Sequence, residues 1–214
     1  MEGYDYEEAA GTLLKIKDIT ANKRNRVILR KLKDNDTDFD KLLVCEGSDS
    51  YVDYYHYHRD DNSMYHPESA KDLRWLGYYI GKNTILEELH LSNPVRGPCH
   101  RHDPSNPTLP NNAIEPFFRG LNCNRSIRKI TFDNMNLSGG EIFRSLGIFF
   151  ENNYNFSELK VHHCVVGSGC TQQLSVALRS CNNSLKSVIL SQNRTGGSSL
   201  TGNEMEGEQL VDII

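Results

Sequence analysis

The chain of 214 residues lacks the features that mark several large classes of protein. It has no run of about 18 uninterrupted apolar residues, so a membrane-spanning helix is not expected. Its first residues are acids and tyrosines rather than a basic start followed by an apolar run, which argues against a secretory signal. A net charge of -4, from 24 Lys and Arg against 28 Asp and Glu, gives no general attraction to nucleic acid or anionic membrane. We therefore expect a cytoplasmic protein that does not enter membranes. Binding to nucleic acid would need a local basic patch, because the overall charge does not favour it.

Recognisable catalytic motifs are also missing. The sequence contains no phosphate-binding G-x-x-x-x-G-K-S/T, no G-x-S-x-G and no H-E-x-x-H. Its six cysteines form no C-x-x-C pair, and reduced thiols are expected. Cys164 follows His162 and His163, but neighbours on a strand point to opposite faces, so these two histidines are not expected to share a site. We expect neither enzymatic activity nor a cofactor nor a bound metal.

The sequence does contain an internal repeat of 29 residues. FSELKVHHC begins at Phe156 and LKSVILSQN at Leu185, and both fit the pattern L-x-x-L-x-L-x-x-N/C. A third copy, IRKITFDNM, begins 29 residues earlier at Ile127. Leu86 begins a partial copy, LEELHLSNP, and Phe39 begins a weaker one. The longer spacing on either side of Leu86 indicates insertions at about residues 47–66 and 94–112.

The segments between the copies are predicted to be helices, because their apolar residues recur at helical spacing. The residues concerned are Leu73, Leu76 and Ile80; Ile114, Phe117, Phe118 and Leu121; Ile142, Leu146, Phe149 and Phe150; and Leu174, Ala177, Leu178 and Cys181. An asparagine stands three positions before each clear copy, at Asn83, Asn124, Asn153 and Asn182. Asparagine tolerates the left-handed conformation that ends a helix, so we expect these four residues to adopt it.

This succession of strand, loop, helix and asparagine turn resembles the ribonuclease-inhibitor-like class of leucine-rich repeats. The resemblance covers residues 39–214 and implies a right-handed α/β horseshoe fragment, with parallel strands on the concave face and helices on the convex face. Residues 1–38 are expected to form an N-terminal helical cap region. Strands should begin near residues 41, 88, 129, 158 and 187 and bury Leu89, Leu91, Ile130, Phe132, Leu159, Val161, Val188 and Leu190. Met135 and Pro94 depart from the family pattern, in which Asn or Cys, here Cys164 and Asn193, ends each strand motif.

The resemblance implies a non-enzymatic scaffold that binds a protein of unknown identity through the concave positions of the strands. Candidate binding residues there are Glu88, His90, Lys129, Asp133, Lys160 and His162. None of these positions holds Tyr, Trp or Arg, the residues that dominate interface hot spots. A solvated sheet face is therefore the alternative.

The insertions offer further candidates. Tyr54, Tyr55 and Tyr57 in the first and Arg101 in the second are typical interface residues. A mobile polar loop is the alternative for both. The insertions also hold zinc-ligand residue types without an established spacing, namely Cys99, His100, His102, His56, His58 and His66. A metal-binding or enzymatic site on the insertions thus stays an alternative function.

A basic run lies near the N-terminus. Its members are Lys23, Arg24, Arg26, Arg30, Lys31 and Lys33, interleaved with Val27, Ile28, Leu29 and Leu32. This alternation predicts an amphipathic helix whose polar side forms the exterior of the cap. Nucleic-acid binding through this helix is the alternative.

At the other end of the chain, Leu210, Val211, Ile213 and Ile214 are expected to complete the apolar face of a final helix. No strand is expected to follow the one formed by residues 185–190, so its hydrogen-bonding edge should stay open. We expect either a fragment of a longer array or end-to-end self-association through that edge.

Overall fold

The computed structural model describes residues 15–45, 63–92, 111–137, 141–179, 181, 184–195 and 209–211. The helices are α2 (Ile16–Ile19), α3 (Lys23–Asp34), α5 (Ala70–Lys82), α6 (Asn111–Leu121), α7 (Glu141–Asn152) and α8 (Ser168–Arg179). The strands are β1 (Lys41–Cys45), β2 (Met64–Tyr65), β3 (Glu88–Ser92), β4 (Lys129–Asp133), β5 (Glu158–His162), β6 (Val165–Val166), β7 (Ser187–Ser191), β8 (Arg194–Thr195) and β9 (Gln209–Val211). The four helices predicted between the repeat copies, the helix of the basic run and the five predicted strand starts are confirmed.

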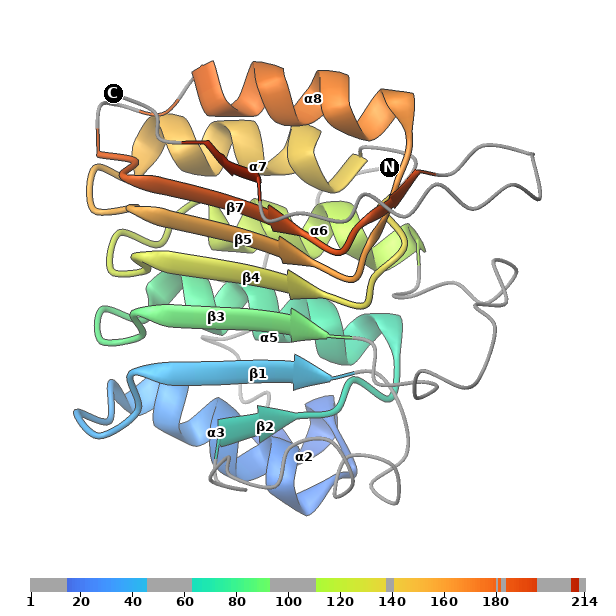
Figure 1. Cartoon of the computed structure of the whole chain (residues 1–214). Coiled ribbons are helices and arrows are strands. Elements are labelled where there is room, and N and C mark those ends of the chain that lie inside the picture. The colour runs from blue at the N-terminus through green and yellow to red at the C-terminus, as the bar shows by residue number, and fades with distance from the viewer. Residues whose placement is uncertain are drawn as a thin grey trace.

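The chain is an α/β protein built on a sheet with the strand order β2-β1-β3-β4-β5-β7-β9 (Figure 1). Its first six strands are parallel, as predicted for the five repeat strands. Pairing is in register: Lys129 lies opposite Glu158, and Glu158 lies opposite Ser187, each 29 residues further along the chain. Equivalent positions of successive strands therefore form straight rows across the sheet.

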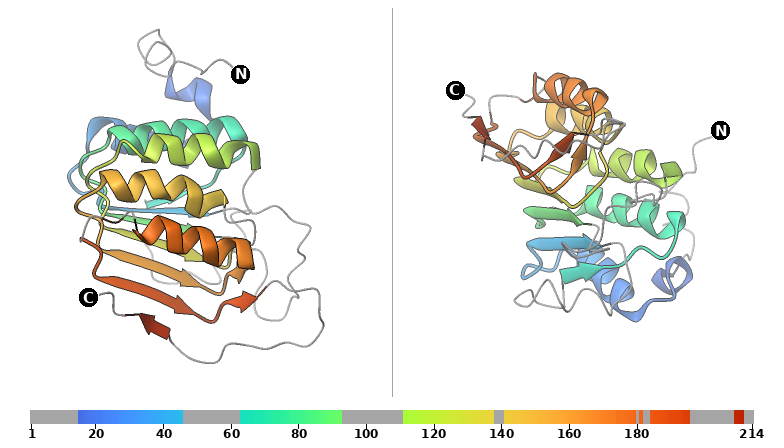
Figure 2. Two further views of the ribbon diagram at one scale, coloured as in Figure 1. Left: turned by 90° about the horizontal axis from the view of Figure 1, so that it is seen from above. Right: turned by 45° about the vertical axis from the view of Figure 1, so that its right-hand side comes forward.

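Helices α5, α6, α7 and α8 lie on one face of the sheet (Figure 2). The burial of β4 and β5 alternates, because side chains at the second and fourth positions point toward these helices. One continuous apolar core extends from Ile19 to Val188. The predicted core residues of β3, β4, β5 and β7 are all at most 2% exposed, apart from Leu190, which is half-buried against the core.

The backbones of α5 and α6 approach closely at three glycines. A Cβ added to Gly77 would overlap the carbonyl oxygen of Phe117, and one added to Gly81 would overlap that of Gly120. A Cβ on Gly120 would in turn overlap the backbone of Gly77. Since glycine lacks a Cβ, these residues allow the two helices to stack at this distance.

The asparagines that precede the strands act differently from the prediction. Asn83 is extended rather than left-handed, with φ -74° and ψ 139°, and the left-handed residues of the described chain do not include Asn124 or Asn153. Asn182 lies outside the described residues. Asn35, which ends α3, does adopt the left-handed conformation. The prediction was wrong because these asparagines use their side chains, not a left-handed backbone.

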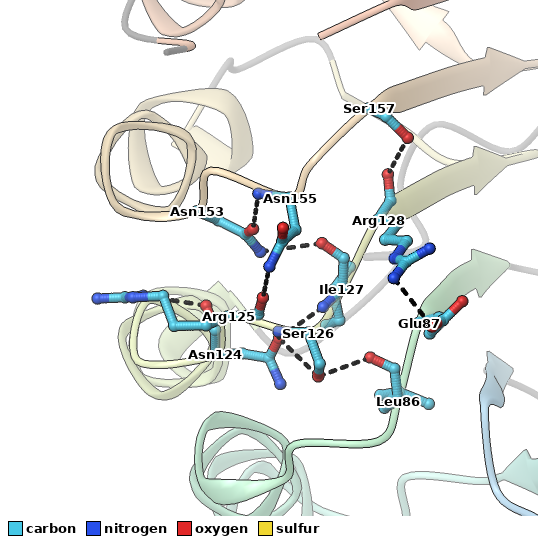
Figure 3. Close-up of polar contacts among 10 residues, drawn as sticks. All are labelled: Leu86, Glu87, Asn124, Arg125, Ser126, Ile127, Arg128, Asn153, Asn155 and Ser157. Carbon is cyan, nitrogen blue, oxygen red and sulfur yellow. Dashed lines mark hydrogen bonds and ion pairs between the residues drawn. The ribbon is translucent and has the colours of Figure 1, made fainter. Parts of the chain in front are cut away.

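Asn83, Asn124 and Asn153 are each at most 1% exposed, and their amides join successive turns of the chain. Figure 3 shows Asn124 and Asn153. The Nδ2 of Asn124 donates to the carbonyls of Ile80 and Asn83, both at 2.8 Å. Its Oδ1 accepts from the backbone N–H of Ile127 at 2.8 Å. Each amide thus satisfies buried backbone groups on both sides, where an unpaired group would be costly.

The Nδ2 of Asn83 donates to the carbonyl of Leu32 at 2.9 Å, and that of Asn153 donates to Ile127 at 2.9 Å. Asn83 and Asn124 therefore reach the last turn of the preceding helix, whereas Asn153 reaches the segment just before β4.

A second series of side-chain bonds follows the other ends of the strands. Asn193 donates from Nδ2 to the carbonyl of Val161 at 2.9 Å and accepts at Oδ1 from the N–H of Cys164 at 2.9 Å. The Sγ of Cys164 in turn accepts from the N–H of Met135 at 3.5 Å. Each of the two side chains supports the turn one unit before its own.

Each edge of the sheet carries a strand that the sequence did not predict. Met64 and Tyr65, at the end of the first insertion, form β2 and pair with Leu43 and Val44. The prediction that no strand follows β7 was wrong, because β9 pairs with it antiparallel, with Leu210 opposite Ile189. Leu210 and Val211 thus belong to a strand rather than a helix, and the edge of β7 is covered in part.

The close approach of α5 and α6 generates a stability prediction. Gly120→Ala should lower the free energy of unfolding by about 1–3 kcal/mol, because the added methyl group forces the helix backbones apart. Gly147→Ala is the matched control, since its Cβ would lie 3.9 Å from the Cα of Ala177, an ordinary contact. In the control, the better helix propensity of Ala should leave stability unchanged or raise it by up to about 1 kcal/mol. Equal losses in urea unfolding would contradict this account of the glycines.

Candidate protein-binding surface

The first, third and fifth side chains of the repeat strands point away from the helices and form the face called here the polar sheet face. Among the described residues, no helix lies on this side of the sheet (Figure 2). Register arranges the side chains in three rows: Lys41, Glu88, Lys129, Glu158 and Ser187; Leu43, His90, Thr131, Lys160 and Ile189; and Cys45, Ser92, Asp133, His162 and Ser191. All six strand candidates from the sequence therefore lie on one face.

Charges of opposite sign alternate along the first row. The two carboxylate oxygens of Glu88 lie 3.4 Å from the Nζ of Lys41 and 3.3 Å from the Nζ of Lys129. The Nζ of Lys160, in the second row, lies 2.8 Å from the Oε1 of Glu158. Such half-exposed pairs contribute only about 0–1 kcal/mol each to stability, but they hold the charged groups in defined places.

The ion pairs shift the pKa values of charged residues in the first row. Burial raises the pKa of Glu88, but its hydrogen bond to Lys129 and the charges of Lys41 and Lys129 outweigh burial and lower the pKa below its usual value. The hydrogen bond to Glu88 and its negative charge raise the pKa of Lys129. Both groups are charged at neutral pH, so a partner would meet a fixed pattern of alternating charge.

Histidines gather around Asp133 where the strands end. The Nε2 of His90 lies 3.9 Å from one oxygen of Asp133, and the Nδ1 of His163 lies 3.1 Å from the other. The rings of His162 and His163 are 6.4 Å apart, and the Nδ1 of His162 is hydrogen-bonded to the Oγ of Ser191. The expectation that His162 and His163 cannot share a site was wrong. His163 follows the end of β5 with φ 50°, so the alternation of a strand no longer applies to it.

Not every side chain of the three rows is accessible. Leu43 and Cys45 are at most 2% exposed and form a small buried cluster with Met64, separate from the main core. The β1 end of the face is thus closed for its second and third rows, although the sequence placed both residues on the exposed wall. The accessible part is centred on β3, β4 and β5.

Three of the described cysteines, Cys164, Cys170 and Cys181, are unsuited to nucleophilic chemistry. Burial raises the pKa of Cys164 to about 12, and burial raises the pKa of both Cys170 and Cys181 to about 11. A thiol with such a pKa carries almost no reactive thiolate at neutral pH. Cys164 instead serves the turn before it, as predicted for a structural cysteine.

The candidates on the insertions cannot be placed on this surface. Tyr54, Tyr55, Tyr57 and Arg101 lie outside the described residues. The same holds for the zinc-ligand types of the insertions except His66. His66 is 5% exposed, and its backbone N–H donates to the Oδ1 of Asn25 at 2.9 Å, so it ties β2 to α3.

A hollow of about 300 Å³ opens at the other ends of the strands. Its lining includes Asn83, Glu87, Arg125 and Arg128. The Nη1 of Arg125 donates to the carbonyl of Asn124 at 2.9 Å, whereas Arg128 pairs with Glu87 at 3.5 Å. The two guanidinium groups point apart (Figure 3), so they do not converge on one anion.

Glu158 and Ser191 also stand at concave positions of the repeat pattern, and the register places both on this face. The sequence overlooked His163 as a member of the surface. His163 depends on the left-handed turn after β5, and its sequence carries no glycine or asparagine signal at that position.

Comparisons with known proteins identify no relative of this chain. No protein-family model matches the chain, and no curated protein matches it. In the part of the chain that the structure describes, no helix is long and apolar enough to cross a membrane. Within the same residues, no group of three or more His, Cys, Asp or Glu side chains is placed to hold a metal ion.

The charged row generates a pH prediction. The folded state lowers the pKa of Glu88, so in acid the unfolded chain binds more protons at this residue than the folded chain. The stability that Glu88 contributes is therefore present above its unfolded pKa, about 4.3, and is lost as the pH falls through the folded value.

Glu88→Gln should cost up to about 1 kcal/mol of unfolding free energy at pH 7 and nothing near pH 3, measured by urea unfolding at both pH values. Glu87→Gln is the neighbouring control, because Glu87 is off the polar sheet face and, among the described residues, forms its ion pair with the exposed Arg128. A Glu88→Gln penalty that persists unchanged at pH 3 would contradict the ion-pair explanation.

Proposed function

We propose that this chain is a non-enzymatic scaffold of leucine-rich repeats, similar to the ribonuclease-inhibitor-like class, that binds a protein through the polar sheet face. Three observations support the repeat assignment. Paired strands recur at 29 residues, β3, β4 and β5 are each followed by a helix on one face of the sheet, and buried asparagines precede these three strands. The bonds of Asn193 and Cys164 fit the ladder that the family pattern implies.

The observation that carries the binding proposal is the in-register array of polar side chains on a face without a described helix. A flat parallel sheet normally has both faces covered, because its strands come with helices on either side. Here the second face of β3, β4 and β5 bears charged and hydrogen-bonding groups instead. Such a surface suits a protein partner with a complementary pattern of charge.

The chemistry of the face indicates how a partner would be recognised. The described rows contain no aromatic side chain other than His, so large apolar anchors contribute little. Glu88, Lys129 and Lys160 instead provide fixed charges for complementary pairing. Binding of this kind gains specificity and association rate from electrostatics and weakens with added salt.

The alternatives have less support. Apart from His66, a metal or enzymatic site on the insertions would use residues outside the described part of the chain, and burial holds the thiols of Cys164, Cys170 and Cys181 protonated. Nucleic-acid binding by the sheet face is not favoured, because Lys41, Lys129 and Lys160 each lie beside a carboxylate. A cytoplasmic location remains a prediction from the sequence.

The proposal is tested by photo-crosslinking in cells from one position on each side of the molecule. A benzophenone amino acid replaces Thr131, at the centre of the polar sheet face, or Val176, which is 55% exposed on α8. We expect a protein adduct from position 131 that is absent from position 176. The protein recovered in that adduct is then purified and its affinity for the chain is measured directly.

Two matched charge reversals complete the test. Lys129→Glu combined with Lys160→Glu should weaken binding of the recovered protein by about tenfold or more. Arg144→Glu with Arg179→Glu, on the exposed sides of α7 and α8, changes the charge equally and should have less than about a twofold effect. Identical adducts from positions 131 and 176, or equal losses in the two double variants, would refute the sheet face as the binding surface.

A further inference from the structure

Helix α3 forms a second exposed surface, at the end of the stack beyond β1 and β2 (Figure 1). Its inner side is fixed, because Ile28, Leu29 and Leu32 are at most 1% exposed in the core. Its outer side carries a line of residues at helical spacing, Lys23, Val27, Arg30 and Lys33, which we call the α3 stripe. The three cations of this stripe are exposed, and Val27 is 44% exposed between them.

Other basic residues of α3 have tasks within the fold. The guanidinium of Arg26 donates to the carbonyls of Thr20 at 3.0 Å and Ala21 at 2.7 Å. The Nζ of Lys31 lies 5.3 Å from the centre of the Phe39 ring. These contacts account for Arg26 and Lys31 as parts of the cap but leave the charges of the α3 stripe unexplained.

The charge of the molecule is strongly divided. Residues 15–34 contain eight Lys and Arg against two Asp, a net charge of +6, whereas the remaining residues carry a net charge of -10. The net charge of -4 therefore conceals a concentration of positive charge in residues 15–34. A basic surface of this kind attracts anionic groups at short range.

We propose that the α3 stripe is a docking site for an acidic amphipathic segment of another protein, with carboxylates beside Lys23, Arg30 and Lys33 and an apolar side chain on Val27. This site is separate from the polar sheet face. A short segment needs contact only with the helix, so its carboxylates stay near the cations of the α3 stripe. Unlike a bare polyanion, it also covers the apolar side chain at the centre of the stripe.

A long polyanion fits this surface less well. Duplex nucleic acid carries one charge per about 1.7 Å of its axis and presents a long continuous row of phosphates, whereas α3 offers one short line of cations. The three exposed cations of the stripe would also neutralise few phosphates. Binding to an anionic bilayer requires a wide apolar face that inserts among the lipids. Val27 is the one exposed large apolar residue of α3.

The experiment measures binding of the full chain by fluorescence anisotropy. The main probe is a labelled 18-residue helical peptide with Leu at every third or fourth position and Glu on both sides of each Leu. The comparison probes are the same peptide with Lys in place of Glu, a 20-base-pair DNA duplex, and vesicles containing 30% phosphatidylserine. We expect the acidic peptide to bind most tightly, and its affinity to fall as NaCl is raised from 50 to 300 mM.

The variants separate charge from apolar contact. Arg30→Glu with Lys33→Glu should weaken binding of the acidic peptide by about tenfold or more, and Val27→Ser by about threefold or more. The equal charge change Arg144→Glu with Arg179→Glu should have less than about a twofold effect. All these residues are exposed, and circular dichroism will verify that each variant remains folded.

Tighter binding of the duplex or the vesicles would overturn the proposal in favour of a nucleic acid or a membrane. No binding of the acidic peptide at 50 mM NaCl, or binding that both double variants weaken equally, would also overturn it. None of these results bears on the polar sheet face, because no substituted residue lies on it.

Discussion

The rest of the structure depends on the buried asparagine amides that join one turn of the chain to the next. A strand that enters a parallel sheet brings backbone N–H and C=O groups into the interior before the ladder can pair them. Asn83, Asn124 and Asn153 satisfy such groups on their own turn and on the turn before it. A buried asparagine stands at the same place before β3, β4 and β5, and these three strands start opposite one another. The in-register rows of the polar sheet face follow from that alignment.

The scaffold and the two proposed binding surfaces use different parts of each unit. Alternate strand residues and the inner sides of the helices form the core, and Gly77, Gly81 and Gly120 let α5 and α6 stack closely. The other strand residues are left to form the polar sheet face. The outer side of α3 is not part of the core, because this helix lies at the end of the stack (Figure 1). Charges on either surface can therefore be reversed with little effect on the core.

The sequence predicted the strands and helices well because each unit repeats two periods at once. Apolar residues lie two apart inside a strand and three or four apart in a helix, and this spacing fixes which residues each element contains. All five predicted strand starts were therefore correct. The short strands β2, β6, β8 and β9 escaped prediction, since two or three residues carry no periodic signal. Their pairing depends on contacts made only after the chain has folded.

The site was predictable where it follows the repeat and unpredictable where the repeat ends. Glu88, Lys129, Asp133 and their neighbours lie on one face because the register requires it. Two interpretations failed because the sequence names a residue but not its conformation. His163 turns back toward Asp133 through a left-handed backbone, whereas Asn83 bonds through an extended one and Asn124 and Asn153 are not left-handed. Leu43 and Cys45 occupy positions of the exposed rows, yet a second buried cluster encloses them.

One pair of neighbouring asparagines tests the central claim most directly. Asn153 is fully buried and bonds to Ile127 and to the N–H of Asn155, whereas the adjacent Asn152 bonds only to Ile148 of its own helix at the surface. Asn153→Ala should lower the free energy of unfolding in urea by about 1–3 kcal/mol, because it leaves buried backbone groups without partners. Asn152→Ala should change it by less than about 0.5 kcal/mol. Equal effects of the two substitutions would contradict the claim that buried asparagine amides hold successive units in register.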